Sequence, residues 1–376
     1  MAGHLVALDL PGGPEFVDAL RRAWDAGDAV LPLDRRLPPD RRAELLDRMA
    51  PRVVVEPAGT TDRARTARPV GDDDALVVVT SGTTGEPRGV VLTHAAVAAS
   101  ATASSARLGV TADDHWIACL PLSHVGGLSV VTRALHVGSG LTVLPGFDAE
   151  TVEDVADRTR EAGRRSFVSL VPTALRRIDA SRFATILLGG ARPPDDRPAN
   201  AVTTYGLTET GSGIVYDRVP LDGVDVRIVD GEVYVRGPML LRGYRDGTDP
   251  TVGGWLPTGD LGYVDPDGRL TVEGRRGELI ITGGENVWPE PVEAALRSHP
   301  DVADVAVTGT DDAEWGQVVT AHVVPRDRPP TLDELRRHAR SELPGFALPR
   351  RLVLVTEIPR TALGKIARVR LAGDTG

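Results

Sequence analysis

The chain has 376 residues, a length that favours two or three domains over one ordinary hydrophobic core. Its formal net charge of −10 argues against nucleic acid or an anionic membrane as the main partner, although a local pocket can still be positive. The single cysteine, Cys119, allows no internal disulfide, and its apolar neighbours indicate a core position. The sequence shows no signal peptide and no apolar run of membrane-spanning length, so we expect a cytoplasmic protein.

Helical and strand patterns alternate over the first 205 residues. A helix is expected over 15–26, where Phe16, Leu20 and Trp24 share one stripe, and a second helix over 40–49. Residues 59–74 are polar and are expected to form a loop. The expected strands lie at 29–33, 53–55, 75–79, 116–120, 141–144, 167–171 and 185–188. This alternation favours a parallel α/β sheet.

The pattern changes after Tyr205. Short strands at 224–229, 232–236 and 270–273 are separated by Asp-Gly turns, which indicates a hairpin-rich β subdomain. The last hundred residues predict a compact α+β domain with helices at 291–298 and 331–342 and strands at 302–308, 318–324 and 351–355. The predicted fold class is therefore α/β: a large N-terminal domain of layered α/β subdomains with a β-rich subdomain, and a small mobile C-terminal domain. We place these domains at 1–276 and 277–376.

A Gly/Thr-rich loop follows the apolar strand at 75–79. It reads Thr80-Ser-Gly-Thr-Thr-Gly-Glu-Pro-Arg-Gly89, and its glycines allow a tight backbone that turns N–H groups toward an anion. Hydroxyl groups and Arg88 suit a polyphosphate. Pro87 stands where the second glycine of a P-loop should be, which disfavours a P-loop NTPase. By itself such a loop is as well explained by a flexible surface turn.

Further motifs make the chain resemble the adenylate-forming superfamily, which includes acyl-CoA synthetases, amino-acid adenylation domains and firefly luciferase. The loop at 80–89 resembles the phosphate loop of that superfamily. The remaining motifs follow in the family's order at 121–127, 189–193, 205–210, 258–260, 274–280, 283–286, 343–350 and 359–365. The resemblance runs from about residue 16 to 370. It implies an enzyme that uses ATP, Mg²⁺ and coenzyme A to convert a small-molecule carboxylic acid into an acyl-adenylate and then a thioester.

The resemblance also implies roles for individual residues. The ATP- and AMP-binding residues would be Thr80, Ser81, Gly82, Thr83, Thr84, Gly85, Arg88, Gly189, Gly190, Ala191, Tyr205, Gly206, Thr208, Asp260 and Arg275. Glu209, with Thr84 or Thr208, would carry Mg²⁺, which prefers oxygen ligands. Asp260 would accept the ribose hydroxyls, although an Asp in such a turn is otherwise an ordinary turn former. Arg88 replaces the usual lysine of the phosphate loop.

The acid pocket would be lined by His124, Gly127, Leu128, Ser169, Val171, Gly206 and Leu207. His124 would lie beside the carboxylate of the acid as a catalytic residue; the alternative is a buried, hydrogen-bonded histidine. The hinge between the domains would be Gly277, and the side that builds the CoA channel would carry Gly283, Gly284, Glu285 and Asn286. Glu278 stands where the family commonly has Asp.

Lys365 is the single lysine among 43 lysine and arginine residues. A coding bias explains the excess of arginine, and a position that keeps lysine under this bias needs a compact point charge on a flexible stem. The resemblance makes Lys365 the catalytic lysine of adenylation, presented by the C-terminal domain before that domain rotates for thioester formation.

The sequence indicates the acid substrate less directly than it indicates the reaction. Residues 16–55 already match the middle of the family's large domain, and a short first lobe of this kind is similar to the o-succinylbenzoate–CoA ligases of menaquinone biosynthesis. Three alternatives remain from the sequence: an o-succinylbenzoate–CoA ligase, a ligase for another small, aromatic or fatty acid, and a non-catalytic nucleotide-binding relative. The sequence leaves the oligomeric state open, a homodimer included.

Overall fold

The computed structural model describes residues 3–80, 87–190, 193–194, 196–360 and 366–371. The chain divides into two compact units. Unit 1 comprises Met1–Arg227, Tyr234–Thr258 and Val264–Leu270, and unit 2 comprises Ile228–Val233, Gly259–Tyr263 and Thr271–Gly376.

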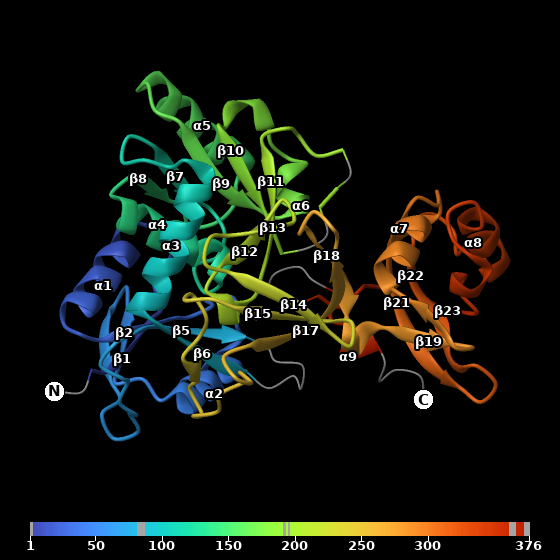
Figure 1. Ribbon diagram of the computed structural model, residues 1–376, viewed down its shortest axis with the longest axis horizontal. Helices are drawn as coiled ribbons and strands as arrows, with labels where there is room; N and C mark the ends of the chain where they lie inside the picture. Colours follow the sequence, from blue (N-terminus) through green and yellow to red (C-terminus); the bar gives the residue numbers. More distant parts are fainter. Residues whose placement is uncertain (1–2, 81–86, 191–192, 195, 361–365, 372–376) are drawn as a thin grey trace. The chain divides into compact units, whose positions relative to one another are not determined.

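The first sheet of unit 1 has a parallel centre and antiparallel edges. Its strand order is β16-β6-β5-β2-β1-β3-β4. The parallel strands are β1 (Leu5–Leu8), β2 (Ala29–Pro32), β3 (Val53–Glu56) and β5 (Asp74–Thr80). The antiparallel strands are β4 (Gly59–Asp62), β6 (Arg88–Thr93) and β16 (Gly243–Tyr244). Helices α1 (Pro14–Asp25) and α2 (Pro39–Met49) connect the parallel strands, as the alternating pattern predicts (Figure 1).

The loop predicted at 59–74 is wrong in its first part. Gly59–Asp62 forms β4, which pairs with β3 in a hairpin at the sheet edge. All four residues of β4 are exposed. A strand with no buried face needs no apolar alternation, because its backbone hydrogen bonds alone hold it to the neighbouring strand.

The second sheet of unit 1 has the order β13-β12-β11-β10-β9-β7-β8. Its parallel strands are β7 (His115–Ala118), β8 (Gly140–Val143), β9 (Ser166–Leu170), β10 (Thr185–Leu188) and β11 (Ala201–Gly206). The antiparallel strands β12 (Gly213–Tyr216) and β13 (Val219–Pro220) complete one edge. The helices that join these elements are α3 (His94–Leu108), α4 (Val125–Val137), α5 (Ala149–Glu161) and α6 (Pro172–Leu175).

A helical layer lies between the two sheets. Helix α3 packs on β5 and β6 of the first sheet, α4 packs on β7 and β9 of the second, and the two helices pack on each other (Figure 1). Small residues fill α3, which allows this close approach: Ala96, Ser100, Ala101 and Ser104 are buried. The second sheet also buries Cys119 at 1% exposure, as predicted, and burial raises the pKa of its thiol to about 12.

The β-rich part of the chain contains a sheet of four strands in the order β14-β15-β17-β18. These are β14 (Asp225–Val229), β15 (Glu232–Arg236), β17 (Leu256–Val264) and β18 (Leu270–Arg275). Asp230 and Gly231 join β14 to β15 with φ angles of 49° and 77°, the left-handed conformation that a two-residue hairpin turn requires. The predicted Asp-Gly turn is therefore confirmed here.

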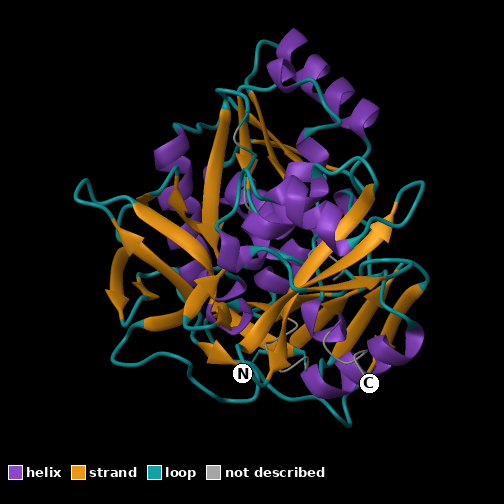
Figure 2. Cartoon of the chain, turned by 90° about the vertical axis from the view of Figure 1, so that its right-hand side faces the viewer, coloured by secondary structure: helices purple, strands orange, loops and turns teal. Residues whose placement is uncertain are grey.

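The C-terminal part of unit 2 packs helices on a sheet of its own. The strands are β19 (Ile280–Thr282), β20 (Glu285–Val287), β21 (Val302–Asp312), β22 (Gly316–Pro325) and β23 (Arg351–Leu354), and the helices are α7 (Pro289–Arg297), α8 (Leu332–Ala339) and α9 (Arg368–Leu371). Buried valines of β21 and β22 and Leu296 and Leu335 of the helices form its core. Strands and helices interleave throughout the described chain (Figure 2), and the predicted α/β class with a smaller C-terminal domain is confirmed.

Candidate active site

The carboxyl ends of β9, β10 and β11 bring several predicted residues together. Because these three strands are parallel neighbours, their ends meet at one edge of the sheet, where open α/β sheets bind ligands. The predicted residues at this edge are Ser169, Val171, Gly189, Gly190, Tyr205 and Gly206. The Gly189 N–H donates to the Leu170 carbonyl at 3.2 Å, and a Cβ on Gly189 would lie 2.6 Å from Thr204 Oγ1. Glycine is thus required where this turn passes the neighbouring strand.

The segment after β11 makes a compact turn. Thr210, fully buried, accepts from the Leu207 N–H at 2.9 Å and donates to the Ser212 carbonyl at 2.7 Å. Gly206 lies so close to the returning chain that a Cβ would be 2.2 Å from the Ser212 carbonyl oxygen. These contacts fix the short 3-10 helix Thr208–Thr210, which carries Glu209.

Residues that lie more than 30 positions later in the sequence fix Glu209 by hydrogen bonds. Its Oε1 accepts a hydrogen bond from the Tyr244 hydroxyl at 2.9 Å, and its carbonyl accepts from the Leu241 N–H at 2.8 Å. Burial raises the pKa of the Tyr244 phenol, and the negative charge of Glu209 raises it further, so the phenol keeps its proton and donates. The predicted metal carboxylate is therefore half-buried and oriented by a neutral donor.

The phosphate-loop motif joins β5 to β6. These strands form an antiparallel hairpin in which Thr80 pairs with Arg88. The predicted residues Ser81, Gly82, Thr83, Thr84 and Gly85 lie outside the described part of the chain, as does Ala191 of the adenine turn. The Arg88 guanidinium stacks 3.7 Å above the centre of the Tyr244 ring and donates to Thr248 Oγ1 at 2.6 Å.

His124 meets two residues that follow β2 of the first sheet. Its Nε2 lies 3.7 Å from Asp34 Oδ2 and 3.4 Å from Arg36 Nη2, and Arg36 grips both oxygens of Asp34 at 2.8 Å. Burial alone would raise the pKa of the Asp34 carboxyl, but the neighbouring His124 ring and the hydrogen bonds donated by Arg36 outweigh burial and hold that pKa far below its usual range. His124 therefore contacts a fixed negative charge and a fixed positive charge.

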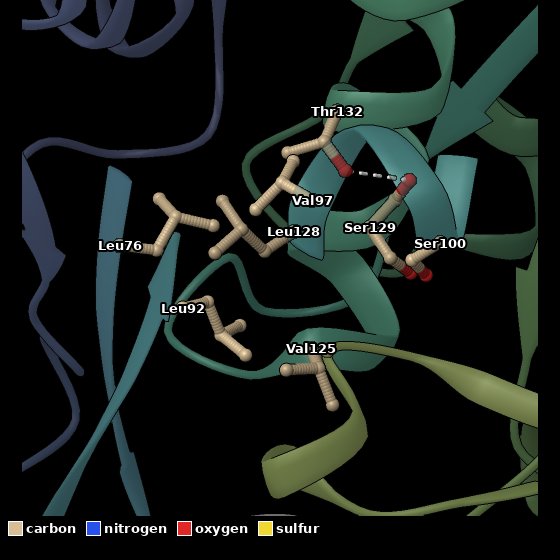
Figure 3. Close-up of a pocket in the computed structure, with 9 residues that line it drawn as sticks. Leu76, Leu92, Val97, Ser100, Val125, Leu128, Ser129 and Thr132 are labelled. Carbon is tan, nitrogen blue, oxygen red and sulfur yellow. Dashed lines mark hydrogen bonds between the residues drawn. The ribbon is translucent and has the colours of Figure 1, made fainter. Parts of the chain in front are cut away.

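A small cavity lies beside the first turn of α4 (Figure 3). Its volume is about 10 Å³, and it is lined by Leu76, Leu92, Val97, Ser100, Val125, Leu128, Ser129, Thr132 and Gly211. This is room for about one water molecule, so the cavity itself does not accommodate a carboxylic acid substrate. Of the predicted acid-pocket residues, Leu128 lines it. Gly127 instead serves close packing, since a Cβ there would lie 2.4 Å from the Leu120 carbonyl oxygen.

Two predicted nucleotide ligands lie together in unit 2. Asp260 on β17 is 5% exposed, and its Oδ1 lies 2.7 Å from Nε of Arg275 at the end of β18. The neighbouring Gly259 N–H donates to Glu232 Oε1 at 3.0 Å, and Arg276 pairs with Glu232 at 3.2 Å. Asp260 and Arg275 thus place a carboxylate acceptor and a guanidinium donor side by side, and such groups can bind two sugar hydroxyls.

The predicted hinge and CoA residues also lie in unit 2. Gly277 has open space where a Cβ would stand. Gly283 and Gly284 form the two-residue turn between β19 and β20 with φ angles of 58° and 85°. A Cβ on Gly283 would lie 2.7 Å from the Trp315 ring, whose face carries the Arg350 guanidinium at 3.8 Å.

Lys365 lies outside the described residues. The residues on either side of its segment are paired: Arg360 and Ile366 form an antiparallel bridge, and Arg360 Nη2 contacts Asp304 Oδ2 at 2.5 Å. Three residues after Lys365, Arg368 contacts Glu278, the residue that follows the predicted hinge, at 2.9 Å.

The sequence analysis missed Asp34, Arg36, Tyr244 and Arg368. Each contacts a predicted site residue or its neighbour across a long stretch of sequence, and the Arg36–His124 contact spans 88 residues. For Tyr244 the local sequence shows a Gly-Tyr pair next to a turn. Such pairs are too common in proteins to assign a role to the tyrosine. Among the described residues, no group of three or more His, Cys, Asp or Glu side chains is arranged to hold a metal ion.

Two known protein-family models match most of the chain. The AMP-binding enzyme family matches residues 56–288, and the AMP-binding enzyme C-terminal domain matches residues 291–365. The chain belongs to the AMP-binding enzyme family. A probable 2-succinylbenzoate–CoA ligase of Mycobacterium tuberculosis (strain CDC 1551 / Oshkosh) is 42% identical over 333 residues, covering 82% of this chain and 86% of that protein. The 2-succinylbenzoate–CoA ligase of Bacillus cereus (strain ATCC 14579) is 37% identical over 338 residues, covering 80% and 70% of the two chains.

Solved structures of this family superpose on the chain. The o-succinylbenzoate CoA synthetase of Bacillus subtilis in complex with its acyl-adenylate intermediate has a TM-score of 0.87 at 28% identity, covering 98% of this chain and 88% of that one. The same enzyme in complex with ATP and magnesium ion has a TM-score of 0.85 at 28% identity, with 98% and 89% covered. No helix among the described residues is long and apolar enough to cross a membrane.

Proposed function

We propose that this chain is an ATP-dependent acid–CoA ligase that acts on o-succinylbenzoate, as in menaquinone biosynthesis. In the first step a carboxylate oxygen of the acid attacks the α-phosphorus of ATP, and pyrophosphate leaves. In the second step the CoA thiolate attacks the acyl carbon of the adenylate, and AMP leaves. ATP and CoA are cytoplasmic metabolites, which supports a cytoplasmic location.

The observation that carries this proposal is the agreement between site and relatives. The predicted adenine and metal motifs lie at the carboxyl edge of one sheet, and relatives at 42% and 37% identity over most of the chain are named 2-succinylbenzoate–CoA ligases. Lys365, Glu209 and Asp260 are all present. A non-catalytic nucleotide-binding relative would be expected to have lost at least one of them.

The nucleotide roles are those that the family resemblance implies, and the positions of the residues are compatible with them. The adenine would lie against the sheet edge that carries Gly189, Gly190, Tyr205 and Gly206. Asp260 would accept from the ribose hydroxyls while Arg275 holds its carboxylate in place. The loop between β5 and β6 would bind the β- and γ-phosphates, since its glycines allow the backbone to turn N–H groups toward an anion.

The described residues suit a magnesium ion that arrives with ATP. Glu209 offers one carboxylate, of which one oxygen is engaged by Tyr244. Mg²⁺ in phosphoryl-transfer sites is bound by one or two carboxylates plus substrate phosphates and water, not by a dedicated protein cage. That donor set agrees with a single glutamate in a turn. When bound, the ion would supply positive charge to the phosphates, and Glu209 would hold it.

For the acid, we propose a pocket bordered by His124 and by Ser169, Val171, Gly206 and Leu207 at the carboxyl edge. His124 can approach a carboxylate because Asp34 and Arg36 fix its position at the start of α4. The cavity in Figure 3, which is lined by other residues and holds about one water molecule, is packing space and not the substrate site.

For the two half-reactions, we propose that residues 277–376 move as a domain about Gly277. One orientation would present Lys365 to the α-phosphate, where a point charge neutralises the developing negative charge. The other would present Gly283, Gly284, Glu285 and Asn286 to the CoA thiol. The stacked pair Trp315 and Arg350 beside this turn offers an aromatic face and a cation to the nucleotide end of CoA.

The test is a panel of acids assayed for pyrophosphate release and for thioester formation with CoA present. We expect o-succinylbenzoate to give the highest kcat/KM, with benzoate, succinate, hexanoate and an amino acid as comparisons. A higher kcat/KM for one of the other acids would assign the alternative substrate. ATP binding without turnover of any acid would contradict the ligase function.

A further inference from the structure

Tyr244 connects the two segments that our proposed function assigns to the phosphates and to the metal ion. It lies on β16, opposite Val90 of β6, the strand that leaves the phosphate loop. From there its hydroxyl reaches Glu209 Oε1 at 2.9 Å. Glu209 stands in a single 3-10 turn, and the Tyr244 hydroxyl fixes one of its carboxylate oxygens.

The Tyr244 ring is itself held in place by Arg88. The guanidinium lies 3.7 Å above the ring centre, a distance at which cation and aromatic face attract each other. Arg88 also donates to Thr248 Oγ1 at 2.6 Å and pairs with Asp246 at 3.4 Å. The Tyr244 N–H donates to the Thr248 carbonyl at 2.8 Å, so ring, cation and turn form one unit.

The stacking explains why arginine suits this position. A planar guanidinium can lie flat on an aromatic ring and donate sideways to Thr248 and Asp246 with the same group. Nη2 of Arg88 makes both of these side contacts. The structure therefore gives Arg88 a role in holding Tyr244, which differs from the phosphate contact expected from its motif.

We propose that Tyr244 is a positioning residue that orients Glu209 toward the metal ion of metal–ATP, and that Arg88 acts through Tyr244. The inference rests on the proposed function, because it takes Glu209 as the metal carboxylate. Partners that hydrogen-bond a metal ligand fix the orientation of that ligand, and their loss lowers metal affinity by about 10- to 100-fold.

The experiment measures metal binding without turnover. Mn²⁺ is titrated into the full chain with ATP and no acid, and free Mn²⁺ is followed by electron paramagnetic resonance; ATP binding is measured separately in EDTA. We expect Tyr244→Phe to weaken Mn²⁺ binding in the ATP complex by about 10-fold, the low end of the range for such partners. Metal-free ATP binding should stay as in the wild type.

Tyr234→Phe is the matched control. Tyr234 also lies under an arginine, with the Arg227 guanidinium 5.3 Å from its ring centre. Tyr234 differs from Tyr244 in that it does not contribute the hydrogen bond to Glu209. We expect it to bind Mn²⁺ like the wild type. Equal weakening by Tyr234→Phe, or wild-type affinity of Tyr244→Phe, would overturn the inference. Thermal unfolding of each variant separates a local effect from misfolding.

Two further variants separate this inference from the proposed function. Glu209→Gln should weaken Mn²⁺ binding more than Tyr244→Phe does; if it has no effect, the metal role of Glu209 itself fails. Arg88→Lys should weaken Mn²⁺ binding less than Tyr244→Phe, and adding it to Tyr244→Phe should cost little more, because both act on one interaction. Arg88→Ala removes the cation altogether; if it weakens metal-free ATP binding, Arg88 is a phosphate ligand and its assigned role is wrong.

Discussion

Arg368 Nη1 lies 2.9 Å from Glu278 Oε2. The contact ties the segment that follows Lys365 to the residue that follows the predicted hinge. The same guanidinium contacts Glu293 Oε1 at 2.8 Å, and the Glu293 side chain is only 4% exposed. One arginine therefore links the segment that resumes after Lys365 to Glu278, next to the proposed pivot, and to the buried Glu293.

Arg368→Ala should destabilise the C-terminal part of the chain. It would leave Glu293 buried without its cation, which typically costs about 3 kcal/mol. Arg370→Ala is the control, because Arg370 lies on the same short helix and is exposed. Urea unfolding would show a large loss for Arg368→Ala and almost none for Arg370→Ala. Equal stability of the two variants would mean that the buried ion pairs do not hold this region.

Asp34→Asn should make stability less dependent on pH in the acid range. The neighbouring His124 ring and the hydrogen bonds from Arg36 keep the pKa of Asp34 below its unfolded value, so as the pH falls below about 4 the unfolded chain takes up this proton first. The stabilisation from ionised Asp34 is complete above this pH and is lost below it. The loss of unfolding free energy between pH 6 and pH 3 should be smaller in the variant by about 1 kcal/mol, allowing for solvent screening.

The measurement is urea unfolding at both pH values. Asp18→Asn, which changes an exposed carboxylate on α1, is expected to lose as much stability between the two pH values as the wild type. If Asp34→Asn behaves like Asp18→Asn, then Asp34 does not stabilise the fold through its ion pair.

Gly206→Ala should damage the adenine motif directly. The added Cβ would lie 2.2 Å from the Ser212 carbonyl oxygen, so the turn that carries Glu209 must shift. We expect a loss of about 2–3 kcal/mol in unfolding free energy, as for other overpacking changes, together with weaker ATP binding. Gly146→Ala is the control, because a Cβ there meets nothing within 4 Å. Normal ATP affinity of Gly206→Ala in calorimetry would show that this turn is not part of the nucleotide site.

Lys365→Ala should separate the two half-reactions. Adenylation should fall by roughly 10²–10⁴-fold, as expected when a transition-state charge contact is removed. Thioester formation from supplied acyl-adenylate should stay nearly normal, because in our proposal that step takes place in the other domain orientation. Lys365→Arg should also adenylate poorly, since its charge is spread over a plane. Stopped-flow measurement of each half-reaction gives the comparison, and full adenylation by Lys365→Arg would refute the point-charge argument.

The sequence was most informative where the chemistry lies in one short stretch. The turn at Gly283 and Gly284 and the motif ending at Thr210 could be predicted because glycine and small polar residues mark such turns locally. The contacts of His124 with Asp34 and of Glu209 with Tyr244 could not, because the two sheets and the strand β16 must first assemble. A strand such as β4, with no buried face, likewise leaves no pattern in the sequence.

In the proposed reaction one chain makes an acyl-adenylate and then transfers its acyl group to CoA. A single-turnover reaction with o-succinylbenzoate, ATP and Mg²⁺, analysed by mass spectrometry before and after CoA is added, tests it most directly. We predict that o-succinylbenzoyl-AMP accumulates with one equivalent of pyrophosphate, and that CoA then converts it to o-succinylbenzoyl-CoA and AMP. Release of ADP in place of AMP, or no adenylate before CoA is added, would contradict the account.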